Sequence, residues 1–188
     1  MAEVTWTAQA FLEQVIDPAL EALALDDAAA RDGLRLLLLG TALQESGLKH
    51  LRQLPNRDGS RGPALGYFQM EPATHDDIWA TWLAYRGPLA SRVLAVAGLL
   101  AGRPKAELLV QNHIYAAVMA RLRYRRAPGR LPAAGDVAAM AAYWKAHYNT
   151  ALGRGRASEF EAKLAAALPA LRAAPQRAWP EAQAFSAG

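Results

Sequence analysis

Residues 34–47 read LRLLLLGTALQESG and place an acidic residue, Glu45, at the end of a strongly apolar helical pattern. Leucines fall on almost every side of this predicted helix, which runs from Asp26 or Asp27 to about Ser46, so we expect it to lie inside the protein. Gly47 follows where a left-handed residue commonly ends a helix. A carboxylate at the end of a buried helix is held rigidly and partly removed from water, and such an environment makes a general acid with a raised pKa.

The alternative for Glu45 is a solvated side chain in a last helical turn, the commoner situation for a glutamate at a helix end. Gly33 and Gly40 cost the same helix about 1 kcal/mol each relative to alanine, and they are tolerable where neighbouring helices approach closely. Residues 53–65, rich in glycine and proline, predict a loop or short hairpin after the helix.

The order of motifs downstream of Glu45 resembles a known family. Glu45-Ser46, a loop, Gly66-Tyr67-Phe68-Gln69-Met70, and then Pro72 and Thr74 are similar to the signature of the lysozyme-like lytic transglycosylases. That signature is Glu-Ser, a variable loop, Gly-Leu-Met-Gln and Pro-x-Thr, with Ala-Tyr-Asn-Ala-Gly far downstream. Here Tyr148-Asn149 matches the Tyr-Asn pair, and the resemblance, strongest to phage-encoded members, spans roughly residues 30–155.

The resemblance implies an activity: cleavage of the β-1,4 bond between N-acetylmuramic acid and N-acetylglucosamine in peptidoglycan. In this family one glutamate serves as acid and then as base, while the sugar supplies its own nucleophile and leaves a 1,6-anhydromuramic product. Glu45 matches that glutamate. The implied fold is all-α in the broad α+β lysozyme-like sense, a helical domain with a catalytic cleft and at most a small β-hairpin region.

The resemblance also assigns roles to other residues. Tyr148 would hydrogen-bond Glu45, Gln69 and Asn149 would contact N-acetylated sugars or brace the site, and Ser46 would support the loop or an acetamido group. The chain departs from the family pattern at Tyr67-Phe68, where Leu-Met is usual, and at residues 150–153, which replace a tighter Ala-Gly turn. Tyr67 is expected to bind substrate, because aromatic rings stack on sugars as well as filling cores.

A hydrolytic muramidase is the alternative enzyme, and it needs a second acid or another way to position water. Asp58 is the leading candidate, because goose-type lysozymes of the same superfamily also place an acid in this loop; its other interpretation is an Asp-Gly turn. Glu71 is the second candidate, and its other interpretation is an acid that favours a helix N-terminus.

Two further hypotheses belong to other classes: a phage virion structural protein that keeps the fold without turnover, and a basic nucleic-acid-binding helical module. The second is suggested by a stretch of arginines around Tyr124, although such stretches are more often a solvated helix face. His75-Asp76-Asp77 has metal-capable side chains, but adjacent helical residues do not share a face, so no metal or cofactor is predicted. The arginine stretch around Tyr124 comprises Arg121, Arg123, Arg125, Arg126 and Arg130.

Composition sets the remaining expectations. The 188 residues predict one domain over 1–174 with a loosely held tail over 175–188. There is no cysteine, which excludes disulfides, and the net charge of +4 favours anionic polymers. The first ten residues lack a secretory pattern and no apolar run suits a membrane span. We therefore expect synthesis in the cytoplasm and delivery to the periplasmic wall through a holin-type lesion or in a phage particle.

Sequence patterns also predict the outer helices. One should begin after Thr7 and run to about Leu25, with a kink or restart at Pro18. Thr74 is expected to cap a second, and Leu89 to Ala101 to form a third. A longer one should run from near Pro104 to Arg126, and another should follow Asp136. The last is expected to open at a Ser158–Glu161 capping box and to reach about Leu171.

Overall fold

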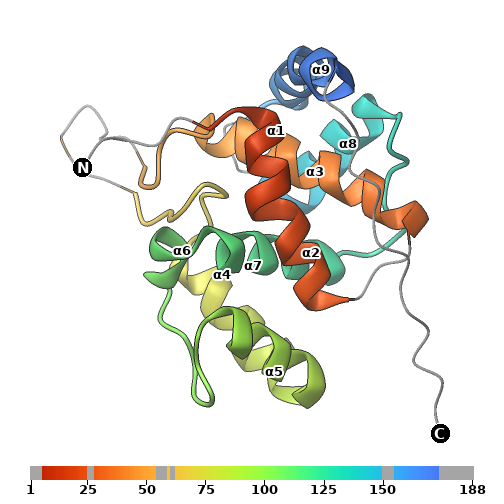
Figure 1. Cartoon of the computed structure of the whole chain (residues 1–188). Coiled ribbons are helices and arrows are strands. Elements are labelled where there is room, and N and C mark those ends of the chain that lie inside the picture. Colours follow the sequence, from red (N-terminus) through yellow and green to blue (C-terminus); the bar gives the residue numbers. More distant parts are fainter. Residues whose placement is uncertain (1–5, 25–27, 54–58, 60–61, 150–154, 174–188) are drawn as a thin grey trace, which may run out of the picture.

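The computed structural model describes residues 6–24, 28–53, 59, 62–149 and 155–173, and these are mostly helical (Figure 1). Within those ranges the only β-type pairing consists of isolated bridges between Arg52 and Leu65 and between Leu65 and Met70, so the predicted all-α character is confirmed. The helices in chain order are α1 (Ala8–Phe11), η1 (Leu12–Ile16), α2 (Asp17–Leu23), α3 (Ala28–Ser46), α4 (Pro72–Asp77), η2 (Ile78–Trp82), η3 (Leu83–Tyr85), α5 (Gly87–Val96), α6 (Leu108–Gln111), α7 (His113–Arg125), α8 (Val137–Trp144), η4 (Lys145–Asn149) and α9 (Ala157–Ala173).

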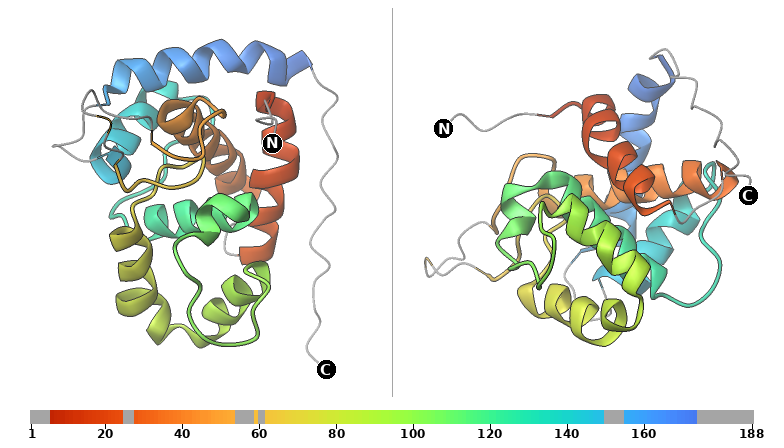
Figure 2. Two further views of the ribbon diagram at one scale, coloured as in Figure 1. Left: turned by 90° about the vertical axis from the view of Figure 1, so that its left-hand side faces the viewer. Right: turned by 60° about the horizontal axis from the view of Figure 1, so that its bottom comes forward.

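The leucine-rich helix α3 is surrounded by other helices, as its pattern predicts. It packs against η1, α7, α8 and α9 (Figure 1). Leu34, Leu38 and Ala42 are fully buried. The helix α9 lies along one end of the molecule and α5 at the opposite end (Figure 2), so the C-terminal end of α3 emerges on the α9 side.

Both glycines of α3 lie where another segment approaches closely, as expected. A Cβ built at Gly40 would stand 2.3 Å from the ring of Phe160 in α9, and one at Gly33 would stand 2.7 Å from the carbonyl oxygen of Pro132. Glycine lowers the intrinsic stability of α3, and the tight packing against α9 and the segment before α8 that it permits offsets this cost.

The N-terminal helix begins and bends as predicted. The Thr7 side chain accepts a hydrogen bond from the Ala10 backbone N–H at 3.1 Å, so it is the N-cap. The turn Leu12–Ile16 is π-helical and continues directly into α2, so the regular hydrogen-bond pattern changes just before Pro18, which has no N–H to donate. The helix ends at Leu23, followed by Ala24 in left-handed conformation.

Three predictions of helix ends were wrong. Glu71, not Thr74, is the N-cap of α4, because Pro72 starts the helix two residues earlier than the threonine. The third helix ends at Val96 rather than near Ala101, since Gly98 adopts a φ of 71° and closes it. The last helix starts at Ala157 rather than after Ser158; Glu159 accepts from the Arg156 N–H at 3.4 Å and occupies the capping role assigned to Glu161.

The predicted long helix ending at Arg126 is interrupted by Asn112. This residue is extended, with φ −127° and ψ 102°, and its side chain accepts from the Tyr115 N–H at 2.9 Å, so it caps α7. Its amide also donates to the Val96 carbonyl at 2.8 Å, which ties the break to the end of α5. An asparagine whose side chain satisfies two backbone partners in this way is more stable at a cap than inside a helix.

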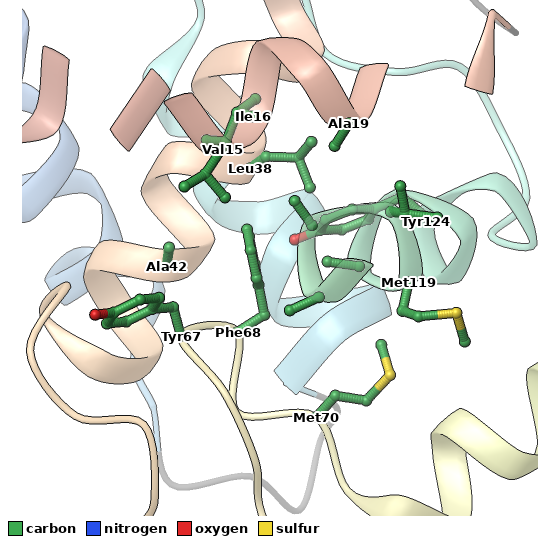
Figure 3. Close-up of a cluster of buried hydrophobic side chains, with 14 of the residues drawn as sticks. Val15, Ile16, Ala19, Leu38, Ala42, Tyr67, Phe68, Met70, Met119 and Tyr124 are labelled. Carbon is green, nitrogen blue, oxygen red and sulfur yellow. The ribbon is translucent and has the colours of Figure 1, made fainter. Parts of the chain in front are cut away.

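The segment between α3 and α4 folds into the core. Leu65 and Met70 exchange two backbone hydrogen bonds of 3.0 Å each, which close a tight turn. Figure 3 shows Tyr67, Phe68 and Met70 in one cluster with side chains of α3 and α7. The turn is therefore anchored by buried side chains beside the C-terminal half of α3.

Several expectations concern other parts of the chain. None of the helices in the described ranges combines the length and apolar character that a membrane crossing requires. The predicted C-terminal tail, residues 175–188, and Asp58 lie outside the described residues.

Candidate active site

A cleft of about 510 Å³ opens at the C-terminal end of α3, between the segment that follows it and α9. Glu45 is the carboxylate on its described lining. The cations there are Lys49, Arg52 and Lys163, and the amides are Gln44, Gln53 and Gln69. A carboxylate surrounded by positive and amide groups suits an anionic, hydrogen-bonding ligand.

Glu45 is half-buried at the last turn of α3, and its Oε1 accepts a hydrogen bond of 3.0 Å from the indole Nε1 of Trp144. Burial raises the pKa of Glu45 from 4.5 to about 7; the Trp144 hydrogen bond and the positive charges of Arg123 and Lys163 offset part of that rise. The carboxyl therefore carries a proton in a large fraction of molecules near neutral pH, as the end of a buried helix predicts.

Ser46 holds the turn that follows α3. Its hydroxyl donates to the Ala42 carbonyl at 3.0 Å and accepts from the Leu48 N–H at 3.2 Å. Gly47 and Leu48 both have positive φ values, 61° and 56°. Ser46 lines the cleft, and its contacts match the loop-supporting role among the two expected for it.

Gln69 lines the cleft together with Ser46 and Lys49. Its side-chain amide donates to the Gly66 carbonyl at 2.8 Å and to the His50 carbonyl at 3.4 Å, so it joins the two loops that border Glu45. Its φ of 44° is uncommon for a residue with a side chain and costs about 1 kcal/mol or more. This geometry corresponds to the bracing role expected of Gln69.

Tyr148 does not hydrogen-bond Glu45, so that prediction was wrong. Its hydroxyl donates to the Phe68 carbonyl at 2.9 Å, and its ring is buried under the guanidinium of Arg123, 4.4 Å from the ring centroid. Because the single hydroxyl proton is used by Phe68, Tyr148 fastens η4 to the turn that carries Gln69. Trp144, one helical turn earlier on the same face, makes the bond to Glu45 instead.

Tyr67 and Asn149 lie away from the described lining of the cleft. Tyr67 is 2 % exposed; its hydroxyl accepts from Trp6 Nε1 at 3.0 Å and its ring packs edge-on against Phe11. The prediction that Tyr67 binds substrate was therefore wrong, because core burial competes with sugar stacking for the same ring. Asn149 accepts from Lys145 Nζ at 2.7 Å, and its amide lies with the Trp144 indole near Gly155.

Of the two candidates for a second acid, Glu71 and Asp58, the structure describes only Glu71. Glu71 is exposed at the N-cap of α4 and does not line the described part of the cleft, so the structure favours the helix-start interpretation. Asp58 lies outside the described residues, and its role stays a prediction.

Sequence reasoning missed several residues of the site. It did not predict the contact of Trp144 with Glu45, it considered Arg123 only as part of the basic stretch, and it gave Gln44 and Lys163 no role. The spacing of Trp144 and Tyr148 was the available signal, because residues four apart share a helix face. The Oε1 atom of Gln44 is buried beside the cleft, and it has no hydrogen-bond partner among the described residues.

The basic stretch is not a continuous solvated face. Arg121 is buried, Arg123 donates to the carbonyls of His147 and Tyr148, and Arg126 pairs with Asp77 at 2.7 Å. Arginines that are already engaged by the protein are poorly placed to contact phosphates.

The side chains of the His75-Asp76-Asp77 run diverge. His75 is buried against the Tyr115 hydroxyl at 2.6 Å, while Asp76 pairs with Arg103 at 2.7 Å. The described residues contain no cluster of His, Asp and Glu with the geometry of a metal site.

Comparison with known proteins adds no relative: no family model, no curated protein and no solved structure matches this chain.

Proposed function

We propose that this chain is a peptidoglycan-degrading glycosidase that cleaves the β-1,4 bond between N-acetylmuramic acid and N-acetylglucosamine by lytic transglycosylation. The observation that carries the proposal is Glu45: a half-buried carboxyl with a pKa of about 7, at the rigid end of a core helix, on the wall of an open cleft. These are the properties of a general acid that works at neutral pH.

The proposed reaction uses this one carboxyl twice. Protonated Glu45 gives its proton to the glycosidic oxygen, and the bond to the muramic C1 breaks through an oxocarbenium-like transition state. The C6 hydroxyl of the same muramic residue then attacks C1 and returns its proton to the Glu45 carboxylate. The products are a free N-acetylglucosamine hydroxyl and a 1,6-anhydromuramic end, and no water is consumed.

The charge of the cleft supports an acidic glycan as substrate. Lys49, Arg52 and Lys163 line the cleft with a single carboxyl, Glu45; the Glu107 carboxylate pairs with Arg52 at 2.7 Å, so Lys49 and Lys163 supply the excess positive charge. The peptide stems of peptidoglycan carry carboxylates, as does the lactyl group of muramic acid where a stem is missing, whereas chitin-type strands of N-acetylglucosamine are neutral.

Hydrolysis is the second candidate, and Asp58 is the feature that favours it. Residue 58 follows the cleft-lining Gln53 by five positions in the sequence. A carboxylate about 6.5–9.5 Å from Glu45 would activate water on the opposite sugar face, and one about 5 Å away would act as a nucleophile. Transglycosylation is preferred because Glu45 is the one acid on the described lining.

Purified protein incubated with isolated cell wall tests the proposal. We expect wild type to release soluble muropeptides and Glu45→Gln to release almost none, because glutamine keeps the shape of the side chain without its acidic proton. Glu71→Gln is the matched control and should retain activity, since Glu71 lies outside the described cleft. Equal absence of release from wild type and Glu45→Gln would favour a virion structural protein without turnover, and salt-sensitive retardation of DNA would favour the nucleic-acid-binding module.

A further inference from the structure

We infer that Trp144 is the positioning residue for the Glu45 carboxyl and that its indole N–H determines which carboxyl oxygen carries the catalytic proton. The inference rests on the proposed function, because it assigns a partner to the proposed acid. Its geometric basis is the 3.0 Å hydrogen bond from Trp144 Nε1 to Glu45 Oε1, which joins α8 to α3 across 99 residues of sequence.

The donor properties of the Trp144 indole determine where the proton of Glu45 lies. An indole N–H only donates, and it does not titrate at physiological pH. Oε1 therefore acts as an acceptor whether Glu45 is protonated or ionised, and the acidic proton is left on Oε2. A tyrosine hydroxyl in the same place would also accept a hydrogen bond, so it would compete with the glycosidic oxygen for that proton. An indole cannot compete in this way.

The indole is held in a narrow slot. Trp144 is fully buried, and its ring stacks on Phe160 of α9 with centroids 5.4 Å apart and planes 25° from parallel. On another side, a Cβ built at Gly155 would stand 2.6 Å from the indole Cη2, so only a glycine fits there without movement. Phe160 in turn packs on Gly40 of α3, and the C-terminal helix thus fixes the orientation of the acid.

Trp144→Phe is the most direct test, because phenylalanine keeps an aromatic ring against Phe160 and removes the N–H. Loss of a hydrogen bond that stabilises the ionised carboxylate should raise the Glu45 pKa by about one unit. We expect the alkaline limb of kcat/KM against pH to move up by that amount. We also expect kcat to fall about tenfold with little change in KM, because a misoriented acid affects chemistry more than binding.

Trp79→Phe is the matched control. Trp79 is also buried, and its Nε1 donates to the Tyr115 hydroxyl at 2.9 Å, away from the cleft. It should lose comparable stability while the pH profile keeps its position. A Trp144→Phe protein with native near-ultraviolet circular dichroism and an unshifted pH profile would overturn the inference.

Nuclear magnetic resonance of the full chain separates this inference from the proposed function, because it needs no substrate. In wild type the Trp144 indole resonance should titrate with the same midpoint as the Glu45 side-chain carbon, and in Glu45→Gln that titration should vanish. This measurement also stands if Trp144→Phe fails to fold. An indole resonance indifferent to Glu45 ionisation overturns the positioning role, whereas a coupled titration in a protein without cell-wall activity overturns the proposed function alone.

Discussion

The ring of Phe160 lies directly against the backbone of Gly40, so that a Cβ at residue 40 would stand 2.3 Å from Phe160 Cζ. Phe160 is fully buried and stacks on Trp144, so it has no free space into which it can move. This contact joins the core helix that ends at Glu45 to the C-terminal helix that forms the other side of the cleft.

Gly40→Ala should therefore destabilise the protein, by about 1–3 kcal/mol, since overpacking forces side chains off their preferred rotamers. Gly135→Ala is the control, because a Cβ at this residue, just before α8, meets nothing within 4 Å and the residue does not precede a proline. That change should be neutral or stabilising, as alanine restricts the unfolded chain. Denaturant unfolding of both variants decides the matter, and a Gly40→Ala protein as stable as wild type would refute the close contact.

The raised pKa of Glu45 makes stability depend on pH. Between pH 4.5 and about 7 the unfolded chain loses the Glu45 proton while the folded protein retains it, so this group's contribution to stability falls as pH rises through that window. Glu45→Gln removes the effect. We expect this variant to gain up to about 3 kcal/mol over wild type at pH 8 relative to the same comparison at pH 4. Denaturant unfolding at the two pH values measures the difference, and a gain independent of pH would contradict the shift.

The proposed glycosidase activity should also depend on the pKa of Glu45, in the alkaline limb of its pH profile. Glu45 must carry its proton to donate it, so cell-wall release should decline as pH rises through about 7. Turnover on isolated cell wall across pH 5–9 measures this limb. Activity that rises steadily from pH 6 to pH 9 would be incompatible with a protonated Glu45 as the donor.

Lys163 is predicted to act on both the acid and the substrate. Its positive charge lowers the pKa of Glu45, and it extends from α9 over the cleft, donating to the Gln44 carbonyl at 3.3 Å. Lys163→Gln should move the alkaline limb to higher pH and raise KM several-fold for acidic glycan strands, with a weaker salt dependence. Lys105→Gln, which removes an exposed charge beside Asp76 and Arg103, is the matched control and should change neither quantity.

Tyr148→Phe distinguishes the observed contacts from those of the resembled family. The change leaves the Phe68 carbonyl without the donor that now lies 2.9 Å away, which should cost about 1–3 kcal/mol of stability. The pH profile should keep its position, because the hydroxyl does not contact Glu45. A shifted profile with unchanged stability would instead support a direct Tyr148–Glu45 bond.

The sequence predicted local features of this fold better than contacts between distant segments. The leucines of residues 34–43 and the glycines at 33 and 40 suffice to predict a buried, closely approached helix, because both signals lie within one element. The break at Asn112 was missed, since the apolar pattern continues through it and only the cap contacts to Tyr115 and Val96 reveal it.

In the candidate site, too, the local feature was predicted and the contact between distant segments was not. Glu45 was predicted because its own helix supplies the burial that raises its pKa. The exchange of roles between Trp144 and Tyr148 was not predictable from spacing, since the two residues share a helix face and differ only in which distant acceptor each one reaches.

Mass spectrometry of the muropeptides released from isolated cell wall tests the central claim most directly. The account predicts fragments that end in 1,6-anhydromuramic acid from wild type and no such fragments from Glu45→Gln. Fragments with reducing ends would show that water is the nucleophile, and Asp58 would then be the candidate second acid. Anhydro ends from Glu45→Gln at the wild-type rate would contradict the assignment of Glu45 as the acid.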